Sequence, residues 1–179
     1  MIYNSPFNVK KYSPEILNNF QKDGVVVFGT GNFGSLAKSA LEQKKININF
    51  FIDNNLNNWG KNFEGKEIIS AKDLLKRNPS ANILIASLNF KYLKRQLKDL
   101  GINNFYDVDF LFDNFDITKA STKWSNDRCK VQLDLYNYSV NATRDSHQLN
   151  VNSIDLVLTE KCSLKCKNCS NLMQYYEQP

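Results

Sequence analysis

Short apolar runs alternate with segments of helical periodicity along the first two thirds of the chain. These strand-like runs cover residues 25–28, 46–52, 83–86 and 105–108. Those at 25–28 and 83–86 are continuous rather than alternating, as expected for strands that are buried on both faces of a parallel sheet. Helices are predicted between them from apolar spacing and from end signals such as Ser13-Pro14 and Gly101. They cover residues 14–22, 33–44 and 90–100, with a short helix after Ser70. This alternation predicts an α/β fold with right-handed crossovers.

A glycine-rich segment follows the first predicted strand directly and opens the next helix. It reads Gly29-Thr30-Gly31-Asn32-Phe33-Gly34. In this context the first glycine permits a tight turn, the second lets a phosphate approach the backbone, and the third lets helix and strand pack closely. Asp53 ends the second strand, 19 residues after Gly34, where a carboxylate can accept hydrogen bonds from ribose. The alternative is a structural turn without ligand, in which Asp53 caps the strand.

The ligand of this loop is left open by the residues. The segments "FGTGNFG" and "FFIDNN" resemble the small Rossmann-like domains of bacterial sugar-modifying proteins. The resemblance implies a nucleotide, a nucleotide sugar or NAD as ligand. No residue nearby is an evident hydride-transfer partner or general base, so oxidoreductase activity has no support, and the catalytic residues are unknown.

Three of the four cysteines crowd into eight residues near the end of the chain, as Cys162-x3-Cys166-x2-Cys169. This crowding favours metal ligation over a disulfide framework. Three thiolates suit an iron–sulfur cluster with one open iron. Two alternatives remain: a zinc site completed by His147 or Cys129, and three unligated thiols.

Together with the apolar run at 154–158, this cysteine motif resembles the start of the barrel in the radical S-adenosylmethionine (radical SAM) superfamily. The resemblance implies that Cys162, Cys166 and Cys169 hold a 4Fe-4S cluster, that S-adenosylmethionine binds its fourth iron, and that an electron donor protein is a partner. Asn168 departs from the aromatic residue that the family often has there. Because such a barrel needs roughly 200 residues, we expect the chain to be the N-terminal part of a longer enzyme.

The expected architecture is therefore a small Rossmann-like parallel sheet with flanking helices, a helical linker, and the first strand and cluster loop of a truncated radical-SAM-type barrel. The four parts are an N-terminal extension (1–22), a Rossmann-like domain (23–112), a linker with a helix near 127–147 (113–153), and the start of the barrel domain (154–179). Residues 57–65 are expected to form a loop.

Composition narrows the function classes. The net charge of +5 is spread along the chain without basic blocks, which argues against a nucleic-acid partner. There is no apolar run near 18 residues and no signal sequence, so we expect a cytoplasmic protein without a membrane partner. The leading function is the N-terminal part of a radical SAM enzyme. The alternatives are a non-catalytic nucleotide-binding or regulatory module with a zinc-binding or vestigial cysteine tail, and a small nucleotide-sugar or NAD enzyme formed by residues 23–112.

Overall fold

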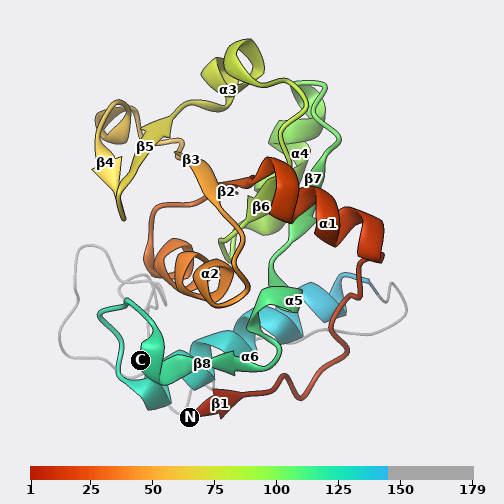
Figure 1. Cartoon of the computed structure of the whole chain (residues 1–179), viewed down its shortest axis with the longest axis vertical. Helices are drawn as coiled ribbons and strands as arrows, with labels where there is room; N and C mark the ends of the chain where they lie inside the picture. Colours follow the sequence, from red (N-terminus) through yellow and green to blue (C-terminus); the bar gives the residue numbers. More distant parts are fainter. Residues whose placement is uncertain (145–179) are drawn as a thin grey trace, which may run out of the picture. The chain divides into compact units, whose positions relative to one another are not determined.

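Five parallel strands form the centre of the fold in the computed structural model, which describes residues 1–144 (Figure 1). A short antiparallel strand, β4, extends one edge. In spatial order the strands are β4 (Asn62–Phe63), β5 (Lys66–Ile69), β3 (Ile48–Ile52), β2 (Val25–Phe28), β6 (Ile83–Ile85) and β7 (Phe105–Asp107). The predicted α/β class with a mostly parallel, Rossmann-like sheet is thus confirmed. The predicted barrel start at 154–179 lies outside the described residues, and the described sheet is open.

Strand β2 lies at the centre of this sheet because its four residues are all apolar. Each is at most 2% exposed. It pairs in parallel with β3 on one side and with β6 on the other, for example through Phe28 with Ile52 and with Ile85. Complete burial on both faces explains why the run is continuous rather than alternating. Its carboxyl end therefore lies between the carboxyl ends of β3 and β6.

The helices agree with the sequence pattern in most places. They are α1 (Pro14–Asp23), α2 (Asn32–Gln43), α3 (Ala71–Arg77), α4 (Phe90–Asp99), α5 (Asp109–Phe112) and α6 (Asn126–Ala142), with 3-10 turns at Leu56–Asn58 and Ile117–Lys119. The Ser13 and Ser70 side chains accept hydrogen bonds at the starts of α1 and α3, as N-caps do. Opposite crossovers from β2 and β6 place α2 and α4 on opposite faces of the sheet.

Five short elements were missed, and one of them, β5, is a strand of the parallel sheet. The predicted loop at 57–65 contains β4, which pairs with β5, so that part of the prediction is wrong. Helix α5 follows β7 directly, and the first strand, β1 (Ile2–Tyr3), pairs with β8 (Phe115–Asp116). Elements of two to four residues are too short to show a period, which explains why the pattern did not reveal them.

Helices α5 and α6 form a second layer against α2 (Figure 1). Tyr136 of α6 anchors this layer because its side chain is fully buried. Its hydroxyl donates to the carbonyl oxygen of Ile85 at 2.9 Å and accepts from the amide of Val108 at 3.4 Å. The phenol therefore joins α6 to the ends of two sheet strands.

Two basic and two acidic side chains form a cluster at the carboxyl end of β7. Arg144 lies 2.7 Å from a carboxylate oxygen of Asp109, and Lys94 of α4 lies 2.7 Å from Asp107. Arg144 also reaches Asp107, at 3.5 Å. Because both aspartates are almost completely buried, these partners are needed to satisfy their charges. The cluster links α4, β7 and the end of α6.

No helix within residues 1–144 is both long enough and apolar enough to cross a membrane. The cytoplasmic location stays a prediction.

Removing the Tyr136 hydroxyl should destabilise the fold. Tyr136→Phe leaves the buried groups of Ile85 and Val108 without this partner, so we expect the free energy of unfolding to fall by about 1–3 kcal/mol. Urea unfolding measures this. Tyr138→Phe in the same helix is the control, since the Tyr138 hydroxyl makes no hydrogen bond within residues 1–144, and it should change stability by less than about 0.5 kcal/mol. Equal effects of the two substitutions would contradict the anchoring role.

Stability should also fall at alkaline pH. Burial raises the pKa of Tyr3, Tyr12 and Tyr136, with further increases from Asp134 at Tyr3 and from Asp107 at the other two. The folded chain therefore holds these protons above pH of about 10, where unfolded tyrosines lose them. The contribution of these tyrosines to the free energy of unfolding is fully present below that pH and declines above it. Urea midpoints at pH 8 and pH 10.5 test this, and Tyr136→Phe should show a shallower decline than the parent chain.

Candidate functional site

The carboxyl ends of β2, β3 and β6 meet at one edge of the sheet. Gly29 follows β2, Asp53 follows β3, and Ala86 follows β6. The Gly29 amide donates to the Ile52 carbonyl and the Ala86 amide donates to the Phe28 carbonyl, both at 2.9 Å, and these hydrogen bonds keep the three strand ends side by side. The crossovers from β2 and β6 leave in opposite directions here, and in open α/β sheets ligands bind at such switch points.

The glycine loop is held by two close backbone approaches. Gly29 has a φ of 123°, and a Cβ atom on it would lie 2.5 Å from the carbonyl oxygen of Ala86. A Cβ atom on Gly34 would overlap the carbonyl oxygen of Gly29. The backbone of α2 therefore reaches the end of β2 only because both positions lack a side chain. These are the roles that the sequence predicted for the first and third glycines.

Gly31 differs, because a Cβ atom on it would meet nothing within 4 Å. It is the N-cap of α2, and no side chain within residues 1–144 caps this helix there. The amide groups of the first turn of a helix have no partner inside the helix. Together with the helix dipole they favour an anion. The space at Gly31 is therefore open on the side from which a phosphate would approach.

Asp53 lies beside this loop and already accepts two hydrogen bonds. One carboxylate oxygen accepts from the Thr30 hydroxyl, and the other accepts from the Asn55 amide at 2.7 Å. The Trp59 indole donates to the backbone oxygen of Asp53, also at 2.7 Å. Asp53 therefore shapes the turn after β3, and since a carboxylate has about four acceptor positions, about two remain for a ligand.

These groups line a pocket of about 380 Å³, which lies in the range of small-molecule sites. Six of the seven predicted site residues line it: Gly29, Thr30, Gly31, Asn32, Phe33 and Asp53. The seventh, Gly34, does not line the pocket but packs against the backbone of Gly29. The opposite wall is the start of α4, with Ser87, Leu88, Asn89 and Tyr92. As at α2, no side chain within residues 1–144 caps α4 at Asn89.

A second pocket of about 650 Å³ adjoins the first and shares Asn54 and Tyr92 with it. The amides of Asn54 and Gln96 exchange hydrogen bonds of 2.8 and 2.9 Å near this junction. Within residues 1–144, four of the seven exposed large hydrophobic residues line these two pockets: Leu56, Trp59, Leu88 and Tyr92. Exposed apolar side chains gathered around hollows are typical of ligand sites.

The sequence reasoning missed the contribution of α4. Ser87, Asn89 and Tyr92 carry no motif. They directly follow the strand predicted at 83–86, and the carboxyl ends of neighbouring parallel strands share one edge. That position was the available signal, but it depends on β6 being the neighbour of β2, which spacing alone does not reveal.

The predicted metal ligands Cys162, Cys166 and Cys169 lie outside the described residues, as does His147. The remaining cysteine, Cys129, is buried in α6, and burial raises the pKa of its thiol. Among residues 1–144 no group of three His, Cys, Asp or Glu side chains is placed to hold a metal ion. Metal binding by the three terminal cysteines stays a prediction.

Comparison with known proteins adds a family match and a fold likeness. The family model described as "C2185-like, N-terminal" matches residues 21–105. No curated protein matches significantly. Among solved structures, the crystal structure of RSP, a Rex-family repressor, is 19% identical with a TM-score of 0.38, and RSP in complex with β-NADH is 20% identical with a TM-score of 0.37. Each comparison covers 73% of this chain and 68% of the other. Similarity at this level does not extend to a ligand or an activity.

These findings correct the radical SAM resemblance, which is wrong. The family model that matches is the C2185-like one, and its match lies at residues 21–105. The resemblance rested on a cysteine spacing and one apolar run within 154–179, and thiolates at such spacing are ligands for several metals. S-adenosylmethionine and the electron donor protein were inferred from that resemblance alone, and the 4Fe-4S cluster from it together with the cysteine spacing; none of the three finds support here.

The two glycines of the loop should respond differently to alanine. Gly34→Ala forces α2 away from Gly29, so we expect a loss of about 1–3 kcal/mol in the free energy of unfolding, as in overpacked sites. Gly31→Ala meets open space, and because alanine is a poorer N-cap than glycine, its capping loss offsets the gain from a stiffer unfolded chain, so the free energy of unfolding should change by less than about 0.5 kcal/mol. Urea unfolding of both variants measures the difference. A Gly34→Ala chain as stable as the Gly31→Ala chain would contradict the close approach.

Proposed function

We propose that this chain is a nucleotide-binding module with a regulatory rather than a catalytic role. The observation that carries the proposal is the open approach at Gly31, between the uncapped starts of α2 and α4 and next to Asp53. The two adjoining pockets contain groups that can bind the phosphate, the ribose and the base of a nucleotide. The ligand is a phosphate-bearing nucleotide, with a mononucleotide, a nucleotide sugar and NAD as the candidates.

The phosphate would bind at the glycine loop. Backbone amides at the start of α2 are its donors, and the start of α4 adds a second favourable dipole from across the pocket. Within the described residues the pocket wall contains no lysine, arginine or histidine. Phosphate recognition here therefore depends on the backbone and on the absence of a side chain at Gly31.

The ribose and the base would follow toward Trp59. Asp53 has acceptor positions left for ribose hydroxyls, and the turn that it holds places the Trp59 indole beside the second pocket. Trp59 is 39% exposed and Tyr92 is 65% exposed. Aromatic faces of this kind stack on nucleobases with little dependence on the base.

The pocket supports binding better than catalysis. Of the fourteen residues that line it, Asp53 is the single carboxylate, and its oxygens hold the loop together. A regulatory role is supported by α4, whose start lines the pocket while its Lys94 pairs with Asp107. Since Asp107 also contacts Arg144, a ligand that moves α4 acts on the end of α6.

The test is calorimetric titration of the full chain with ADP, UDP-glucose and NADH. We expect at least one of them to bind, and Gly31→Glu to weaken its affinity at least tenfold, because a carboxylate then occupies the phosphate approach. Asn103→Glu is the matched control. It adds the same charge at an exposed position before β7, at the opposite edge of the sheet, and should leave the affinity unchanged.

Two results would contradict the proposal. The first is that none of the three nucleotides binds to the folded chain. The second is that Gly31→Glu and Asn103→Glu have the same small effect, which would make the glycine loop a structural turn.

A further inference from the structure

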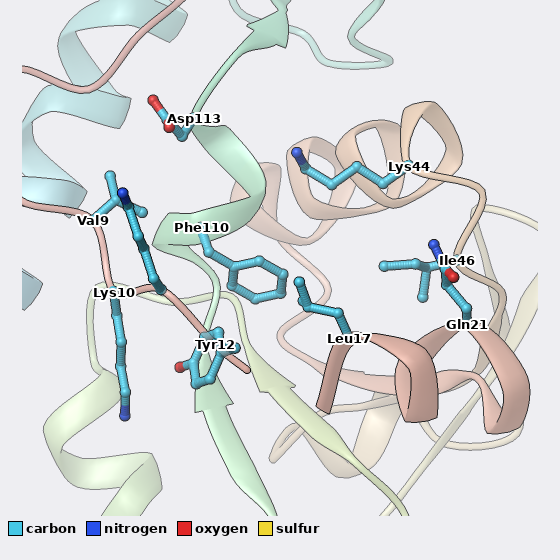
Figure 2. Close-up of a pocket in the computed structure, with 10 residues that line it drawn as sticks. Val9, Lys10, Tyr12, Leu17, Gln21, Lys44, Ile46, Phe110 and Asp113 are labelled. Carbon is cyan, nitrogen blue, oxygen red and sulfur yellow. The ribbon is translucent and has the colours of Figure 1, made fainter. Parts of the chain in front are cut away.

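A third pocket, of about 540 Å³, lies away from the glycine-loop pocket and shares no lining residue with it (Figure 2). Its walls come from the N-terminal segment at Val9–Tyr12, from α1, from the connection between α2 and β3, and from Phe110 of α5. These elements are distant in sequence and meet on the α2 face of the sheet. The glycine-loop site does not account for this cavity.

The inner surface of the pocket is apolar and rigidly held. Figure 2 shows Phe110 and Leu17 facing one another across its centre, with Tyr12 below and Ile46 at one side. The rings of Tyr12 and Phe110 pack edge to face at 5.0 Å. The Tyr12 hydroxyl accepts from the amide of Asp107 at 3.2 Å, which fixes this ring from behind. The apolar surface is therefore preformed.

The rim of the pocket is positively charged. Lys10, Lys11 and Lys44 line it together with one carboxylate, that of Asp113. Within residues 1–144, none of these three lysines forms an ion pair with a carboxylate. Lys10 instead lies over the Tyr12 ring, with its Nζ 5.0 Å from the ring centre. In Figure 2 Lys44 extends along the upper side of the pocket above Phe110.

We propose that this pocket binds a small amphipathic carboxylate, with an aliphatic body against Leu17, Ile46 and Phe110 and its charged end at Lys44. The volume lies in the range of small-molecule sites and is too small for a folded partner element. The three ammonium groups at the rim favour a ligand whose end is negatively charged. A carboxylate satisfies both the apolar centre and the charged rim.

The experiment compares octanoate with 1-octanol, which has the same chain length without the charge. Each is titrated into the full chain and followed by amide and methyl NMR shifts. We expect saturable shifts at Leu17, Ile46 and Phe110, and octanoate binding several-fold more tightly than 1-octanol. Shifts that do not saturate, or equal affinities for the two compounds, would overturn the proposal.

Two variants and a control locate the binding. Lys44→Glu should weaken octanoate about tenfold and leave 1-octanol unchanged, whereas Lys45→Glu, an exposed neighbour outside the pocket wall, should affect neither. Gln21→Trp adds a large ring from an exposed position at the rim and should weaken both compounds without disturbing the core. Equal effects of Lys44→Glu and Lys45→Glu would show only a general charge effect and would refute the site.

A third probe separates a small molecule from a peptide partner. An acidic, leucine-rich decapeptide should bind more weakly than octanoate, because the pocket admits one chain end and not a strand or helix. If the peptide binds more tightly and shifts amides over the outer surface of α1, the occupant is a protein segment and the small-molecule assignment fails. These outcomes are independent of nucleotide binding at the glycine loop.

Discussion

The fold depends on the close approach of two backbones at Gly29 and Gly34. Because neither position carries a side chain, the first turn of α2 packs directly against the end of β2. This approach aims the start of α2 at the switch point of the sheet, where the ends of β3 and β6 lie on either side. The open space at Gly31 and the position of Asp53 both follow from it. A side chain at Gly34 would change all of these at once.

Much of this arrangement was predictable from local signals. The run at 25–28, the glycine spacing and the position of Asp53 each carry their structural meaning within a few residues, and the structure brings them together. Ser87, Trp59 and Tyr92 were not predictable in the same way. Their place in the site depends on which strands are neighbours and on the turn held by Asp53, and both are properties of the folded chain.

The radical SAM inference failed for the opposite reason. It inferred a whole fold from one local cysteine spacing, although that spacing covers a small part of the chain and suits several metals. The α/β prediction drew on the whole length of residues 14–108, and many weak signals agreed with one another. Agreement among many strand, helix and turn signals predicted the fold better than a single specific motif did.

The glycine-loop pocket and the lysine-rimmed pocket differ in the groups that line them. One combines backbone amides, a carboxylate and aromatic faces, and the other combines an aliphatic surface with lysines. Tyr12 connects them, because its ring forms part of the lysine-rimmed pocket while its hydroxyl contacts the backbone of Asp107. Asp107 in turn pairs with Lys94 of α4, the helix whose start lines the glycine-loop pocket. Contacts to one buried aspartate therefore run from the walls of both pockets.

The most direct test of the central claim is a crystal structure of the full chain grown with the tightest-binding nucleotide. The account predicts phosphate oxygens within hydrogen-bond distance of the amides at residues 31–33, and ribose hydroxyls on the Asp53 carboxylate. A nucleotide bound elsewhere, with the space at Gly31 left empty, would contradict it.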